Sequence, residues 1–174
     1  MQTTSLVLTA IAEDRPGLVE TLASIVARHD GNWIESSMSR LAGAFAGIVR
    51  VEVPVGRSEE LEAALGALAG EGIAVTVKQA DAASENHGQA AHVSLMCQDH
   101  PGILHALATL FAARRVSITE LETEAYAGSM SGERMFRAEV DVVLPIDLAA
   151  SDLSQELERL AGDMMAEISL ADVT

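Results

Sequence analysis

The sequence predicts an α+β fold built from two copies of one βαββαβ unit, and three observations lead to this prediction. A tight Asp-x-Pro-Gly turn followed by an apolar-striped segment occurs at residues 14–28 and again at residues 99–113. In both halves the segments that follow alternate between strand-like and helix-like apolar spacing in the same order. Apolar residues make up 49% of the 174 residues, which is enough to form a core in two small domains.

The two halves align at one offset. Asp14 and Asp99 are 99 − 14 = 85 positions apart, whereas Pro54 and Pro145 are 145 − 54 = 91 positions apart. The second half therefore carries 91 − 85 = 6 additional residues. We expect them in residues 126–134, whose glycines and serines suit a longer hairpin loop. The predicted domains are residues 1–80 and 91–174, joined by the small, polar linker DAASENHGQAA.

In the first half, residues 6–12 form a short, nearly continuous apolar run, which predicts a central strand. Asp14 is predicted to be the N-cap of the following helix, with Pro16 in its first turn. Spacing at i, i+4, i+7 and i+8 predicts one buried helix face. Its members are Leu18, Leu22, Ile25 and Val26.

Two alternating runs, residues 32–41 and 45–53, predict a hairpin. Ser58 is predicted to cap a second helix, and residues 73–77 form the last strand. The second half repeats this pattern, with Ser151 predicted to cap its second helix. The resulting order predicts a four-stranded antiparallel sheet with two helices on one face, the ferredoxin-like arrangement. Because the other sheet face lacks helices, we expect the two units to pair and the chain to form a homodimer or larger homo-oligomer.

Composition excludes several functions. The formal net charge of −15 repels a phosphate backbone, so direct nucleic-acid binding is not expected. Cys97 is the single cysteine, which leaves no partner for an intrachain disulfide and fits a buried strand position. The N-terminus has no basic region of a signal peptide, and no apolar segment is long enough for a membrane span. These features predict a soluble, cytoplasmic protein.

Catalytic and metal-binding patterns are not found in the sequence. The five histidines, His29, His87, His92, His100 and His105, show no metal-ligand spacing. No nucleophile elbow, dinucleotide-binding glycine pattern or P-loop occurs. We therefore expect a protein that is not an enzyme and that needs no metal or cofactor.

A βαββαβ unit whose first strand runs into Asp-x-Pro-Gly and an amphipathic helix resembles the ACT domain. The wider sequence is similar to the glycine cleavage system transcriptional repressor family, in GNWIESSMSRLAGAFAGIVRVEVP and in ITELETEAY followed by MFRAEVDVVLP. Members of that family are tandem ACT pairs without a DNA-binding domain. The resemblance implies a regulator that binds a small amino acid, with glycine as a candidate. It also implies that the regulator represses transcription by binding a protein partner such as a transcription activator.

The resemblance implies an amino-acid site at each turn. The first N–H groups of a helix have no internal partners and suit a carboxylate, and an aspartate suits an ammonium group. Glycine allows a ligand to approach the backbone closely. The candidate residues are Asp14, Arg15, Pro16, Gly17, Leu18 and Asn32 in the first unit, and Asp99, His100, Pro101, Gly102, Ile103 and Ser117 in the second.

Several alternatives stay open at this stage. If Asp14 caps its own helix, its charge opposes an incoming carboxylate. The turn is also a helix-entry pattern in any fold, and duplication alone would repeat it. The alternating acids Glu120, Glu122 and Glu124 predict either a solvated sheet face or a partner-binding patch. The alternative function is an amino-acid-binding regulatory subunit of an amino-acid metabolic enzyme.

Overall fold

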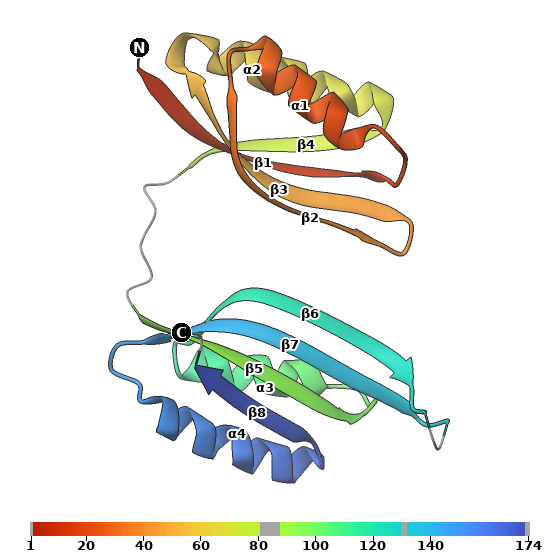
Figure 1. Ribbon diagram of the computed structural model, residues 1–174, viewed down its shortest axis with the longest axis vertical. Helices are drawn as coiled ribbons and strands as arrows, with labels where there is room; N and C mark the ends of the chain where they lie inside the picture. The colour runs from red at the N-terminus through yellow and green to blue at the C-terminus, as the bar shows by residue number, and fades with distance from the viewer. Residues whose placement is uncertain (1, 81–87, 130–131, 173–174) are drawn as a thin grey trace. The chain divides into compact units, whose positions relative to one another are not determined.

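The computed structural model describes residues 2–80, 88–129 and 132–172. The chain folds into two compact units, Met1–Ser84 and Glu85–Thr174 (Figure 1). Most of the expected linker, and the tip of the expected longer hairpin loop, lie outside the described residues. The domain limits of 1–80 and 91–174 therefore stay a prediction.

The first unit has the predicted element order. Its elements are β1 (Thr3–Glu13), α1 (Leu18–Arg28), β2 (Asn32–Leu41), β3 (Ala44–Pro54), the 3₁₀ turn η1 (Val55–Arg57), α2 (Ser58–Gly66), the 3₁₀ turn η2 (Ala67–Glu71) and β4 (Ile73–Gln79). The sheet order is β2-β3-β1-β4, and all neighbouring strands are antiparallel. The strand predicted to be central, β1, lies between β3 and β4.

The second unit repeats this arrangement. Its elements are β5 (Gly88–Gln98), α3 (Ile103–Ala113), β6 (Ser117–Ala127), β7 (Arg134–Pro145), α4 (Ala150–Met164) and β8 (Glu167–Asp172). The sheet order β6-β7-β5-β8 matches that of the first unit. Even the irregularity in strand pairing recurs at the same offset, between Trp33 and Glu35 and between Ile118 and Glu120. The predicted α+β fold of two ferredoxin-like units is confirmed.

Both helices of each unit lie on one face of its sheet (Figure 1). The predicted face of α1 is buried against that sheet. In α3 three of the four equivalent positions are buried, while Leu110 packs partly exposed against the same core. Cys97 is buried in β5, as its apolar surroundings predicted, and burial raises the pKa of its thiol. Alternation along the strands sends the remaining side chains to the helix-free face.

The second helix of each unit begins differently from the prediction. Ser58 is not an N-cap: it is the first residue of α2, and its hydroxyl donates a hydrogen bond to the Val55 carbonyl at 2.9 Å. The turn η1 precedes α2 without a break, so the chain is already helical where a cap was expected. In the second unit, α4 starts one residue before Ser151.

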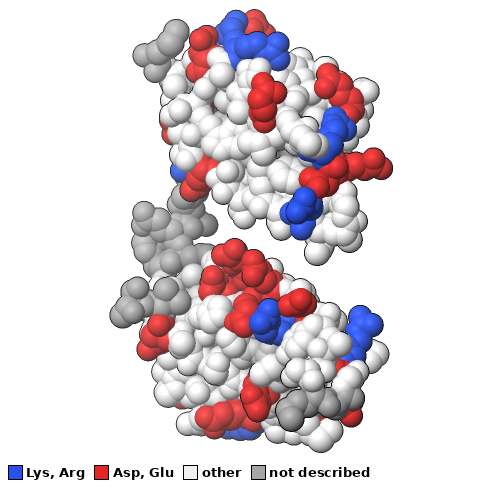
Figure 2. Space-filling model, turned by 45° about the vertical axis from the view of Figure 1, so that its right-hand side comes forward, with Lys and Arg blue, Asp and Glu red and all other residues white. Residues whose placement is uncertain are grey.

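The helix-free faces of the two units have different chemistry. In the first unit, Ile11 and Ile48 on this face are 53% and 55% exposed. In the second unit, Glu120, Glu122 and Glu124 share the helix-free face, as their alternation predicted, and all three are exposed. Figure 2 shows acidic side chains gathered on the surface of this unit. The duplication has therefore preserved the fold but not this surface.

Candidate functional site

The turn at the start of α1 leaves the helix without a side-chain cap. Gly17, not Asp14, occupies the N-cap position, and no side chain forms a capping hydrogen bond there. Gly17 has a φ of 91°, a left-handed conformation that glycine adopts without strain. A Cβ atom built on Gly17 would meet nothing within 4 Å, so the helix start is open to solvent. The predicted cap by Asp14 is wrong because three more residues separate this side chain from the first helical turn.

Asp14 is instead held by the hairpin between β2 and β3. Its backbone N–H donates a hydrogen bond to the Gly43 carbonyl at 2.9 Å. Its carboxylate lies 3.1 Å from the guanidinium Nη1 of Arg40. The Asp14 side chain is 30% exposed and that of Arg40 is 71% exposed, so the ion pair lies at the surface. The turn thus presents a carboxylate and a guanidinium beside an uncapped helix start.

The second unit builds the same arrangement. Gly102 is the N-cap of α3, with a φ of 93° and no side-chain cap. The Asp99 N–H donates to the Arg134 carbonyl at 2.8 Å, and the Asp99 carboxylate lies 2.9 Å from Nε of the same arginine.

The two arginines come from positions that are not equivalent in the repeat. At the offset of 85, Arg40 aligns with Ala125, and at the offset of 91, Arg134 aligns with Gly43. The arginine that pairs with the turn aspartate therefore comes from a different position of the repeat in each unit.

Two other candidate residues of the turns make local contacts. Arg15 donates from Nη2 to the Glu71 carbonyl at 2.7 Å and so links the turn to the end of η2. In the second unit, Nδ1 of His100 lies 3.1 Å from the Pro101 carbonyl oxygen. The turn residues Pro16 and Pro101 are exposed, whereas Leu18 and Ile103 point into the cores.

The structure does not bring Asn32 and Ser117 to the turns of their own units. Asn32 pairs with Glu52, which pairs with Ser5 at the start of β1, whereas the turn follows Glu13 at its end. These β1 positions are 13 − 5 = 8 residues apart, or roughly 26 Å along a strand. The reason is topological: α1 runs back along the sheet, so the next strand begins at the far end. Ser117 is placed in the same way in the second unit.

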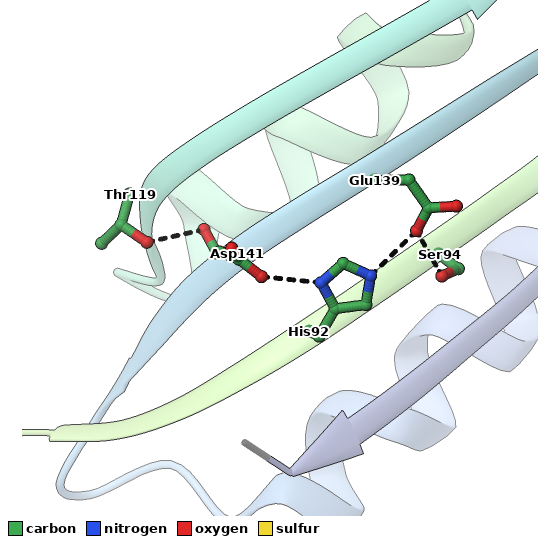
Figure 3. Close-up of polar contacts among 5 residues, drawn as sticks. All are labelled: His92, Ser94, Thr119, Glu139 and Asp141. Carbon is green, nitrogen blue, oxygen red and sulfur yellow. Dashed lines mark hydrogen bonds and ion pairs between the residues drawn. The ribbon is translucent and has the colours of Figure 1, made fainter. Parts of the chain in front are cut away.

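A polar cluster on the helix-free face of the second unit was missed by the sequence analysis (Figure 3). His92 of β5 lies between two carboxylates of β7. Its Nδ1 is 2.6 Å from Asp141 Oδ1, and its Nε2 is 2.8 Å from Glu139 Oε2. Ser94 donates its hydroxyl to the same Glu139 oxygen at 2.5 Å. The pattern His-x-Ser facing Glu-x-Asp in two pairing strands was visible in the sequence, but only the register makes it a cluster.

The electrostatics of this cluster follow from its hydrogen bonds. The bond to Asp141, and then that to Glu139, raises the pKa of His92 above its ordinary value. The bond from Ser94, and then that from His92, lowers the pKa of Glu139. Both shifts favour an imidazolium between ionised carboxylates.

Surface depressions lie on both units. One of about 340 Å³ in the first unit is lined on the helix-free face by Val7, Ile48 and Arg50, with residues of β2. Another of about 470 Å³ in the second unit lies beside β8 and includes Ser94, Arg137 and Glu139. Neither depression includes a residue of the two turns.

Within the described residues, no three histidine, cysteine or acidic side chains are grouped so that they could hold a metal ion. His87 lies outside this part of the chain. Among the described helices, none has the length and apolar character to cross a membrane.

Comparison with known proteins agrees with this description. Residues 4–78 match the model of the ACT domain family. The first unit is thus an ACT domain, and the second repeats its element order, sheet order and strand register. The chain therefore consists of two units with one fold, and the first of them matches the ACT domain family.

Two solved structures resemble the whole chain. A protein of Galdieria sulphuraria described as unknown is 26% identical, with a TM-score of 0.85 over 99% of this chain and 100% of that chain. A protein proposed to be a glycine cleavage system transcriptional repressor is 19% identical, with a TM-score of 0.73 over 100% of this chain and 99% of that chain. The second likeness shows a shared fold. No significant match was found among curated proteins.

Proposed function

We propose that this chain is a non-enzymatic regulator that senses a small amino acid at its two turns and represses the glycine cleavage system through a protein partner. One observation carries the sensing proposal. In both units an aspartate and an arginine flank an uncapped helix start. The likeness in fold to a protein proposed as a repressor of that system supports the regulatory part.

The charges at each turn complement a zwitterion. An amino acid offers one ammonium group and one carboxylate. The turn aspartate can accept from the ammonium, while the arginine and the free helix-start N–H groups can donate to the carboxylate. Because the aspartate pairs with the arginine and does not cap the helix, its charge does not occupy the position where a carboxylate would bind. The same position in two units, with arginines of different origin, supports a shared role for the pair.

The expected affinity is modest. Glycine has five non-hydrogen atoms, and a limit of about −1.5 kcal/mol per atom gives at best about −7.5 kcal/mol, or micromolar binding. We therefore expect micromolar to millimolar affinity for glycine or another small amino acid. Such weak binding suits a sensor, because the ligand must dissociate when its concentration falls.

Calorimetry with the twenty amino acids tests whether a site exists, and replacing the arginines tests its chemistry. We expect Arg40→Gln combined with Arg134→Gln to weaken glycine binding roughly tenfold or more, because a charge-assisted hydrogen bond to the carboxylate is lost. Binding of glycinamide, which lacks the carboxylate, should change little. Equal losses for both ligands would argue against recognition of the carboxylate by these arginines. Absence of binding by every amino acid at millimolar concentration would refute the sensor.

The proposed action on transcription goes through a protein. The net charge of −15 supplies no counterion-release term for binding DNA. Affinity purification should therefore recover a transcription activator with the chain. Recovery of an amino-acid metabolic enzyme would favour the regulatory-subunit function, and sub-micromolar binding of the isolated chain to duplex DNA would contradict both.

We also propose self-association of this regulator. The strands β2 and β6 lie at the edges of their sheets and offer unpaired backbone groups to a second copy. Sedimentation velocity is expected to find at least a dimer at about 10–50 µM, a range in which micromolar interfaces assemble. A monomer throughout this range would contradict the proposal. Sedimentation at a higher salt concentration provides a check. Salt screens the charged side chains along the strand edges but leaves backbone hydrogen bonds intact, so the dimer should persist.

A further inference from the structure

The His92 cluster belongs to the second unit alone. At the offset of 85, His92 and Ser94 align with Val7 and Thr9 of the first unit. At the offset of 91, Glu139 and Asp141 align with Ile48 and Arg50. The first unit thus has apolar side chains where the second has an imidazole and one carboxylate. It provides a reference with the same fold inside the same molecule.

The geometry of the cluster requires two hydrogen-bond donors on one ring. Each imidazole nitrogen faces a carboxylate oxygen within 2.8 Å. An ionised carboxylate only accepts hydrogen bonds, and a neutral imidazole has only one N–H. The imidazolium satisfies both contacts, whereas neutral His92 would direct a nitrogen lone pair at one of the carboxylates. The arrangement therefore favours protonated His92 over neutral His92.

The surrounding charges also affect which protonation state of His92 is favoured. On β6, Glu120 and Glu122 lie opposite Asp141 and Glu139 and share their face. On β7, Arg137 also lies on this face, but its guanidinium is 2.9 Å from Glu124.

On β8, the residue opposite His92 is Ala171. Its neighbour Asp172 accepts a hydrogen bond from the Gln89 side chain at 2.9 Å. The helices of the unit lie on the opposite face of the sheet (Figure 1). Deprotonation of His92 would leave Glu139 and Asp141 beside two further glutamates.

We propose that His92 is a pH-sensitive latch that ties β5 to β7 in the second unit only. When protonated, it joins the strands through both carboxylates. When neutral, it loses one contact and leaves mutually repelling acids, so the strand pair opens more often. The second unit thereby gains a response to pH near neutrality that the first unit lacks.

The direction of the response follows from the two pKa shifts. The pKa of His92 is raised in the folded state, so its contribution is complete below about 6.5, the ordinary histidine value. That contribution is lost as pH rises through the folded-state value. The pKa of Glu139 is lowered, so its contribution is complete above about 4.3 and is lost as pH falls further. The latch is therefore closed in weak acid and opens on the alkaline side.

Amide hydrogen exchange of the full chain between pH 6 and pH 8.5 tests the latch. Protection of the β5 and β7 amides is expected to fall about two- to fivefold relative to that of the β1 and β3 amides, as for ion pairs that are partly exposed. The ratio within one molecule cancels the intrinsic pH dependence of exchange. His92→Gln should make this ratio independent of pH, whereas His105→Gln, at an exposed position of α3, should leave the response unchanged.

An NMR titration of the wild-type imidazoles provides a second measurement that needs no variant. His92 is expected to titrate above the ordinary histidine value of about 6.5. The proposal is overturned if His92 titrates at or below that value. It is equally overturned if the protection ratio does not change with pH, or if His92→Gln folds and keeps the wild-type response.

Discussion

The chain carrying both Asp14→Asn and Asp99→Asn is expected to bind glycine roughly tenfold to 150-fold more weakly than the unmodified chain. Asparagine has nearly the same shape as aspartate but no charge, so it cannot form a charge-assisted hydrogen bond with the ligand ammonium. Such bonds contribute about 1.5–3 kcal/mol, which corresponds to an affinity loss of roughly tenfold to 150-fold. Starting from an affinity of about 1 µM, this loss gives a dissociation constant of about 10–150 µM, which calorimetry resolves from that of the unmodified chain.

The matched control for this prediction is Asp147→Asn. Asp147 also pairs with an arginine, Arg115, at 2.6 Å, and both side chains are exposed. It precedes α4, but it follows Pro145, which pairs with Gly88 at the end of β5 opposite to Asp99. Its replacement should leave glycine binding unchanged. Single variants then distinguish the two turns, since only the occupied turn should respond to loss of its aspartate. Unchanged affinity in the folded double variant would show that the turn aspartates do not hold the ligand.

The substitution Phe111→Ala is expected to destabilise the second unit by about 3–5 kcal/mol. Phe111 is 1% exposed and is among the largest fully buried side chains in the described residues. It packs in the core between α3, α4 and the sheet, where the removed ring leaves a cavity. A loss of this size is a large fraction of the stability of a domain of about 85 residues.

Denaturant unfolding followed by far-UV circular dichroism measures this loss, and fluorescence of Trp33 reports separately on the first unit. The fluorescence transition is expected to move less than the dichroism transition. Leu41→Ala is the control: Leu41 is 79% exposed, and its replacement should change the free energy of unfolding by less than about 0.5 kcal/mol. A change below about 1 kcal/mol for Phe111→Ala would contradict the described core.

The duplication could be predicted from the sequence because the same turns and apolar spacing recur at a fixed offset. Local residue preferences do not produce a repeat of that length. The matched turns and the spacing of apolar residues in α1 and α3 predicted which faces are buried. The structure confirms those faces, with Leu110 partly exposed. The exposed alternation of Glu120, Glu122 and Glu124 was predicted for the same reason, since strand geometry alone determines which side chains share a face.

Details at helix starts were harder to predict. Asp14 has a residue type that favours capping, but Gly17 begins the helix with a left-handed backbone and moves Asp14 away from it. The partner that Asp14 has instead, Arg40, lies 26 residues further along the chain. Such a contact depends on the hairpin returning to the turn, which residue preference does not describe.

By itself, the sequence determined the fold class, the duplication, the positions of the turns and most of the buried residues. These features depend on periodicity and on local backbone preference, which neighbouring residues carry. Only the tertiary structure decided that Asn32 lies far from the turn of its own unit, that each turn aspartate meets an arginine, and that His92 lies between Glu139 and Asp141. The physical reason is common to all three: each depends on strand order and register, which bring together side chains distant in sequence.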